Sequence, residues 1–514
     1  MRVRFVLCFC LGALPLRAET PLSAIDWLDN PTPVRVAPAP GPDVQSLRDE
    51  APVADGVVTP DVSVMPIGEA SDRLTVGLLP ATVTGLPETL WEQSDAKAVQ
   101  RAIEQTDLRD LSALQKLYYT MMLAEAVPPS GMEAEAFLTV RAGQLRKFGA
   151  IEPAEALVER LPLASPQHFA LWFDLTLLAG LEDKACIALN EKRGLSNDYA
   201  AQIFCALRGE DWDGAALLFD TADALGLLSS TEHRLLLAFL DPEYAEDAPS
   251  LAPPRDISAL EFRLYEAVGN PLPTASLPIA YAVSDLRDLA GWKAQIEAAE
   301  RLVRNGALSA NALLGLYTER KPAASGGVWE RVRAVQNIEA ALVKPDPERL
   351  SQALQDAHYQ MADYGLTPAL AEIYAPEIAE LELTAAGDAM RFMLTLMSDA
   401  YETARVDPAQ ESVHTRFMQS LAAGTPEGAE ALNYPLAEAI EEGFDTGVPD
   451  EELAALMAEG KLGEAILLAA EHMTSGLNGN MGALKSGIAA MRQMGLEDIT
   501  RRASLQMMLK KPRD

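Results

Sequence analysis

The chain is poor in basic and in aromatic residues. Its 514 residues include 42 lysines and arginines against 75 aspartates and glutamates, which gives a formal net charge of −33 at pH 7. Such an acidic protein is repelled by the phosphates of nucleic acids and by anionic lipid surfaces, so we expect neither as a partner. Aromatic residues make up only 6% of the chain, although 49% of it is hydrophobic. The apolar residues are therefore mainly aliphatic, which favours packed helices over β-sandwiches.

The motifs of common catalytic and metal sites are also missing. The two nearest of the five histidines, His358 and His414, are 56 positions apart, and none belongs to a His-Glu-x-x-His zinc motif. A Gly-x-Ser-x-Gly motif is absent too. Ser94 and Lys97 have the serine–lysine spacing of penicillin-binding enzymes, but the companion Lys-Thr-Gly motif is missing and Ser94 is placed to cap a helix. We therefore predict a protein that is not an enzyme, with no catalytic residue, cofactor or metal.

Long hydrophobic runs are absent, and the longest one near the N-terminus has the features of an export signal. Arg2 and Arg4 precede an apolar run of 12 residues, 5–16, and Ala18 offers a small residue for cleavage. A membrane-spanning helix needs about 20 apolar residues. We therefore predict a signal peptide at residues 1–18, a periplasmic or secreted mature protein, and no membrane span.

Cysteine is scarce, and two of the four cysteines fall within the predicted signal peptide. The remaining two, Cys186 and Cys205, lie on either side of the loop 194–196. Asp183 and Ser196 are candidate caps for two helices that would pair here as an antiparallel hairpin. Such a hairpin would bring the cysteines together, so a disulfide is expected in an oxidising compartment. Two buried thiols packed as small apolar residues are the alternative.

Proline is concentrated in two segments that divide the chain. Residues 21–87 hold 11 of the 34 prolines, so we interpret 19–90 as a disordered proline-rich tether. Its apolar island of Ile25, Trp27 and Leu28 is a candidate partner-binding peptide, which would dock on another protein or on the protein's own helices. Seven more prolines lie within 242–279, which we interpret as a hinge.

The other two parts of the chain have the 3.6-residue periodicity of helices and follow one another as helical arrays, at 91–241 and 280–514. Most predicted helices have 10 to 16 residues and short links. Examples that bear on the structure are 166–179, 347–362, 408–422 and 426–442. This alternation predicts an all-α fold, an irregular α-solenoid of antiparallel helix pairs after the disordered proline-rich N-terminal segment.

One helical pair has a family pattern. Small and aromatic residues recur there at Tyr199, Gly209, Trp212, Ala215, Phe219 and Ala222. Over residues 196–222 the chain resembles the tetratricopeptide repeat, in which small alanines let two helices approach and aromatic side chains fill the space between them. The resemblance implies an array of helical hairpins that binds proteins on a concave face.

These observations lead to a functional hypothesis with two alternatives. We expect an exported periplasmic helical-repeat scaffold or adaptor that binds protein partners, for example within an envelope-spanning machine such as a flagellar or secretion complex. One alternative is a cell-wall-modifying hydrolase or lyase whose site is dispersed among the helices. The other is a self-associating structural protein; the sequence leaves the oligomeric state open.

Overall fold

The computed structural model describes residues 75–108, 111–241, 243, 252–287 and 289–510. Residues 70–514 form one compact unit. The predicted signal peptide and most of the predicted tether therefore lie outside the described residues. The same holds for Ile25, Trp27 and Leu28.

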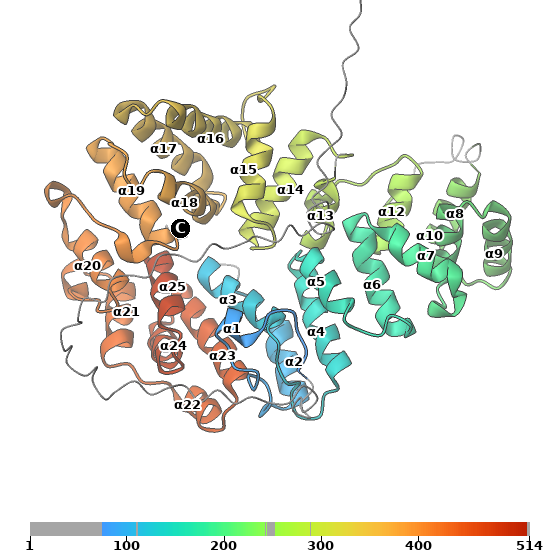
Figure 1. Ribbon diagram of the computed structural model, residues 1–514, viewed down its shortest axis with the longest axis horizontal. Helices are drawn as coiled ribbons and strands as arrows, with labels where there is room; N and C mark the ends of the chain where they lie inside the picture. Colours follow the sequence, from blue (N-terminus) through green and yellow to red (C-terminus); the bar gives the residue numbers. More distant parts are fainter. Residues whose placement is uncertain (1–74, 109–110, 242, 244–251, 288, 511–514) are drawn as a thin grey trace, which may run out of the picture. The chain divides into compact units, whose positions relative to one another are not determined.

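The first part of the compact unit is a series of helices joined by short links (Figure 1). Their bounds are α1 (Ala81–Thr84), α2 (Ala96–Gln105), α3 (Ser112–Leu123), α4 (Ala134–Lys147), α5 (Ile151–Val158), α6 (Pro166–Ala179), α7 (Glu182–Glu191), α8 (Tyr199–Arg208), α9 (Trp212–Ala224) and α10 (Ser230–Leu240).

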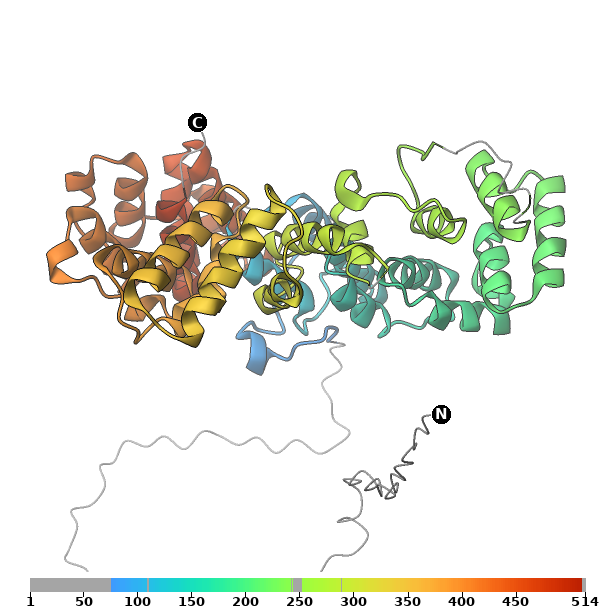
Figure 2. The ribbon, with the colours of Figure 1, turned by 90° about the horizontal axis from the view of Figure 1, so that it is seen from above.

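The series continues to the end of the described chain. Its members are α12 (Ala259–Ala267), α13 (Ala282–Asp285), α14 (Trp292–Arg304), α15 (Ala310–Glu319), α16 (Val328–Val343), α17 (Pro347–Ala362), α18 (Thr367–Glu377), α19 (Ala385–Met397), α20 (Val413–Ala422), α21 (Pro435–Asp445), α22 (Glu451–Ala458), α23 (Leu462–Ser475), α24 (Met481–Gln493) and α25 (Glu497–Leu509). Most helices pack against their neighbours in sequence, as the view from above also shows (Figure 2). The described residues contain no β-strand, so the predicted all-α architecture of paired helices is confirmed.

Proline marks two helix starts correctly and two incorrectly. Helices α6 and α17 span the predicted ranges, because proline fits the first helical position, where its missing N–H is not needed. The predicted helices 408–422 and 426–442 begin too early. Pro408 opens only a short 3₁₀ turn, and α20 begins after Ser412, which forms a capping box with Thr415. Helix α21 begins at Pro435.

Three predicted caps are also displaced by one or two residues. Asp95, not Ser94, caps α2, and Asp198, not Ser196, caps α8; each aspartate accepts hydrogen bonds from two amides of the first turn. Asp183 lies within the first turn of α7 and does not precede it. In the first two cases a carboxylate close to the predicted serine provides the stronger acceptor for the free amides.

The proline-rich stretch that we interpreted as a hinge contains α12, which packs against α6 and α10. Arg263 of α12 reaches the buried carboxylate of Glu182, with 2.6 Å between Nη2 and Oε1. Just beyond the stretch, the Ser284 hydroxyl donates to the carbonyl of Leu178 at 2.8 Å. Through these contacts the stretch connects α6–α10 to α13 and α14 within one unit.

The last helices pack against the first, and we call this the closing contact: α25 and α23 against α3 and α2. Gln506 caps the start of α3, because its Oε1 accepts from the Ala113 amide at 3.0 Å and its Nε2 donates to the Ser112 hydroxyl at 2.7 Å. Near the start of α23, the Gly463 amide donates to the carbonyl of Leu90 at 2.8 Å, beside the fully buried ring of Trp91. The closing contact therefore joins residues almost 400 positions apart.

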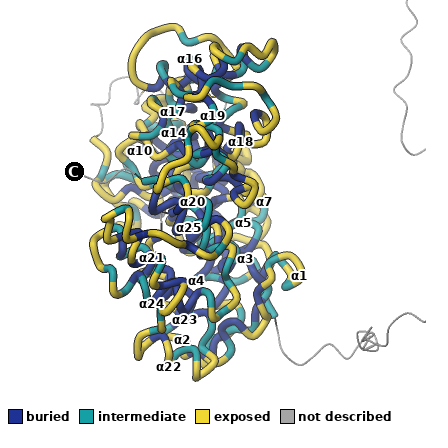
Figure 3. The backbone as a smooth tube through the Cα atoms, turned by 90° about the vertical axis from the view of Figure 1, so that its left-hand side faces the viewer, coloured by how far each residue is buried: buried dark blue, intermediate teal, exposed yellow. Residues whose placement is uncertain are grey.

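Buried residues follow the faces on which helices meet, whereas exposed ones lie mainly in links and on outer faces (Figure 3). One charged pair lies within the core of α14–α18. Arg331 contacts Glu300 through two hydrogen bonds of 2.7 and 2.6 Å, and the Tyr317 hydroxyl donates to the same carboxylate at 2.8 Å.

No described helix is both long enough and apolar enough to cross a membrane.

Candidate functional site: a cavity beside the closing contact

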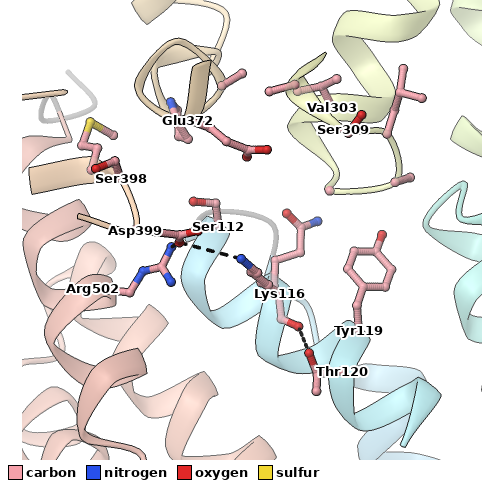
Figure 4. Close-up of a pocket in the computed structure, with 18 of the residues that line it drawn as sticks. Ser112, Lys116, Tyr119, Thr120, Val303, Ser309, Glu372, Ser398, Asp399 and Arg502 are labelled. Carbon is pink, nitrogen blue, oxygen red and sulfur yellow. Dashed lines mark hydrogen bonds and ion pairs between the residues drawn. The ribbon is translucent and has the colours of Figure 1, made fainter. Parts of the chain in front are cut away.

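A cavity of about 610 Å³ lies beside the closing contact. Its walls come from α3, the α14–α15 link, α18, the segment after α19, and α25 (Figure 4). Elements from both ends of the described chain therefore line one space. A volume of this size lies within the range of about 300–1,000 Å³ typical of ligand sites.

Helix α3 supplies one wall of the cavity, because one of its faces packs in the protein core and another lines the cavity. Leu114, Leu117 and Met121 are among the residues that it buries in the protein core. The cavity side has its own helical spacing and consists of Ser112, Gln115, Lys116, Tyr119, Thr120 and Leu123. At positions three or four apart, these side chains lie on one stripe of the helix.

The corner between α3 and α14 is fixed by hydrogen bonds to a single carbonyl. The Tyr119 hydroxyl donates to the Asn305 carbonyl at 2.8 Å, and the Gln115 amide group donates to the same oxygen. Burial raises the pKa of Tyr119, so its hydroxyl is neutral at physiological pH. This corner is thus a rigid, uncharged part of the wall.

The charged groups of the cavity lie on opposite sides (Figure 4). Asp399, after α19, contacts Arg502 of α25 at 2.5 Å and Lys116 of α3 at 3.8 Å. The Arg502 side chain is 17% exposed, whereas that of Lys116 is 66% exposed. Across the cavity, Glu372 of α18 is exposed, and it has no ion pair or hydrogen bond within the described ranges. One wall thus has two cations around one carboxylate, and the other has a free carboxylate.

Apolar groups cover the surface between these charges. They include Leu123, Leu308 and Met397, together with Pro368 and Pro376 of α18. Because proline lacks an N–H, Pro376 cannot donate to the carbonyl of Glu372, as the fourth residue along a helix normally does. Pro376 therefore contributes an apolar ring, and no donor, to the wall that carries Glu372.

This arrangement is suited to binding. Ligand sites are mostly apolar, with a few polar groups that fix orientation, and the cavity has this composition. No histidine or cysteine is among the described residues that line it. The hydroxyl of Ser398 donates to the Thr395 carbonyl at 2.8 Å, so this serine is not paired with a base.

The predicted disulfide is confirmed, and it lies outside the cavity. Cys186 of α7 and Cys205 of α8 are bonded, with 2.01 Å between the sulfurs and 4.8 Å between the Cα atoms. Both cysteines are buried, and neither lines the cavity. The bond connects two consecutive helices, so its role is structural.

Other residues considered in the sequence do not converge on the cavity. Ser94 is fully buried, and its hydroxyl has no hydrogen-bond partner in the part of the chain that is described, whereas Lys97 is exposed. His233 contacts Asp223 at 3.1 Å. No cluster of three or more potential metal ligands occurs among the described residues.

Sequence reasoning missed the cavity because its walls are distant in sequence. Two local signals pointed to parts of it. Helix α3 has a second, less buried stripe of Lys116, Tyr119 and Thr120 beside the face that it buries in the core. In α18, Pro368 and Pro376 each lie four residues, about one helical turn, from Glu372. Neither signal indicates that the two helices share a space.

Comparison of the chain with protein-family models, curated proteins and solved structures finds no match.

Proposed function

We propose that the protein is an exported helical scaffold or adaptor that binds a protein partner through the cavity beside the closing contact. The observation that carries the proposal is a cavity of ligand size, with apolar walls and charges on two sides, built by helices from both ends of the described chain. Two supporting features are the disulfide, which suits an oxidising compartment, and the export signal that the sequence predicts at residues 1–18. An envelope-spanning assembly such as a flagellar or secretion complex is the setting that we propose.

Two further elements belong to this proposal. The tetratricopeptide-like unit is supported by the burial of Ala215, Phe219 and Ala222 on α9, which packs against α8. The apolar island of Ile25, Trp27 and Leu28 is proposed as a second contact with the partner. An adaptor with two contacts gains affinity through the high effective concentration of the second site.

Site-specific crosslinking tests the use of the cavity. A photo-crosslinking amino acid replaces Thr120 on the cavity wall, or Thr139 on α4, outside the cavity, as a matched control. Both threonines are half-buried, and both hydroxyls donate to the carbonyl four residues earlier, so the positions are locally alike. We expect a defined protein partner at Thr120 and none at Thr139.

The crosslinked partner is then purified and its binding measured. Thr120→Trp fills part of the cavity and should weaken binding, whereas Thr139→Trp should leave it unchanged. Equal crosslinking at both positions, or binding that is insensitive to Thr120→Trp, would contradict the proposal.

One observation favours the cell-wall hydrolase or lyase as a second candidate, because Glu372 is a lone carboxylate at a cavity. Against it, Glu372 is exposed, whereas the general acids of glycosidases are held in apolar surroundings. Digestion of purified peptidoglycan decides between the two. Soluble muropeptides released by the natural protein but not by Glu372→Gln would establish the enzyme.

A further inference from the structure

The charges on the two sides of the cavity define the chemistry of its occupant. We propose that the cavity binds a short extended peptide segment that carries an acidic side chain for Lys116, a basic side chain for Glu372, and small apolar residues between them. This inference rests on the proposed function, because it specifies which part of the partner enters the cavity.

Lys116 is available for an acidic side chain. Its distance to Asp399, 3.8 Å, exceeds that of a direct hydrogen bond, and both side chains are mostly exposed, at 66% and 71%. Asp399 is already neutralised by Arg502 at 2.5 Å. The Lys116 ammonium can therefore turn to a new carboxylate and lose little, since exposed ion pairs contribute at most about 1 kcal/mol.

Glu372 is available for a basic side chain. It is exposed and makes no ion pair with any described residue. An ammonium or guanidinium group can therefore donate charge-assisted hydrogen bonds to this carboxylate without displacing another cation.

The arrangement discriminates against other ligands. A nucleic acid or an anionic lipid can pair with Lys116, but it brings negative charge towards Glu372. A polycation can pair with Glu372, but it brings positive charge towards Lys116. A free zwitterionic amino acid supplies both charges but leaves Leu123, Leu308 and Met397 uncovered. A peptide segment supplies both charges and covers the apolar surface between them.

Synthetic peptides test the inference on the full chain. Four capped peptides share an Ala-Val-Ala centre and differ only in the flanking residues, which are Asp and Lys, Asp and Asp, Lys and Lys, or Asn and Gln. Calorimetry measures their binding. We expect the Asp–Lys peptide to bind about tenfold more tightly than the uncharged one, a difference equivalent to about 1.4 kcal/mol.

Charge reversals should change the preference in opposite directions. Lys116→Glu should favour the Lys–Lys peptide, and Glu372→Lys should favour the Asp–Asp peptide. Matched reversals at Lys321 and Glu382, exposed residues that do not line the cavity, should change nothing. Lys116→Gln and Glu372→Gln provide milder variants, and each should remove the preference for one charge without reversing it.

Equal binding of the four peptides, or variants that weaken all four alike, would overturn the inference. So would competition by free lysine at the concentration at which the Asp–Lys peptide binds. Crosslinking at Thr120 without any charge rule for the peptides leaves the adaptor function standing and removes this inference. If the peptides show the charge preference but no partner crosslinks at Thr120, the adaptor function is removed and the peptide preference of the cavity stands.

Discussion

At the scale of single residues, Arg141 anchors the start of the described chain. Its side chain is fully buried, and the guanidinium donates to the carbonyls of Ala124 at 2.8 Å and Val76 at 2.7 Å. It also lies over the Phe137 ring, 4.3 Å from the centroid. Burial lowers the pKa of Arg141 to about 9, so the group is still protonated at pH 7. Through these bonds Arg141 holds the segment that brings Leu79 to the cavity.

Replacing Arg141 should therefore destabilise the protein strongly. In Arg141→Met the buried Ala124 carbonyl loses its donor and the Val76 carbonyl keeps only the Ala126 amide, so we expect a loss of about 3 kcal/mol in the free energy of unfolding. Urea unfolding followed by circular dichroism measures the loss. The control is Arg160→Met, an exposed arginine, which should change stability by less than about 0.5 kcal/mol. Equal effects of the two substitutions would show that the buried hydrogen bonds of Arg141 contribute little.

Two glycines provide opposite tests of close packing. A Cβ atom on Gly463 would overlap the Trp91 ring, so Gly463→Ala should destabilise the protein by about 1–3 kcal/mol. Gly315 is a helical glycine with open space around it, so Gly315→Ala should stabilise the protein by up to about 1 kcal/mol. Thermal unfolding of both variants gives the comparison. A stabilising Gly463→Ala would mean that Trp91 can move aside.

At the scale of helices and their pairs, the disulfide strengthens the α7–α8 hairpin. Cys186 and Cys205 are 19 positions apart, and closing a loop of this size stabilises a fold by roughly 3 kcal/mol in the chain-entropy model. Reduction, or the double substitution Cys186→Ser with Cys205→Ser, should lower the melting temperature. Peptide or partner binding should persist at temperatures where the protein is folded, because neither cysteine lines the cavity. Loss of binding at unchanged stability would contradict a purely structural role.

Local sequence predicts the helices well where the helix start is chemically marked. The ranges of α6 and α17 follow from the proline at the first helical position. Where two starts compete, the outcome depends on the surroundings. Pro408 and Ser412 are both acceptable starts by local rules, and only Ser412 leads into a helix that packs against α25. The position of the disulfide was predictable because the hairpin that contains it is local.

The cavity could not be predicted in the same way, because it depends on tertiary contacts. Lys116 and Arg502 are both bound to Asp399, yet the three residues come from segments separated by about 100 positions or more. Periodicity shows which face of α3 is apolar. It does not show which helix covers the other face, since that depends on how every intervening pair of helices is oriented.

At the scale of the whole compact unit, the closing contact makes α3 dependent on α25. Removing residues 497–514 takes away Gln506, the cap of α3, and exposes apolar residues that α3 buries. We expect amide hydrogen exchange in α3 to accelerate at least about tenfold, which corresponds to a local loss of about 1.4 kcal/mol. Exchange in α8, which lacks contact with α25, is the internal control and should change little. Uniform acceleration in both helices would indicate global unfolding of the unit.

The closing contact also imposes an order on events during synthesis. Lys116 emerges early, but Arg502 and Gln506 follow almost 400 residues later. At about 5–20 residues per second, synthesis of the residues between them takes about 20–80 seconds, and only then can the other side of the cavity form. A chain interrupted within that interval has helices but no complete cavity. Occupancy of the cavity would therefore distinguish molecules that contain α25 from fragments that lack it, so that a partner recruited there joins only the former.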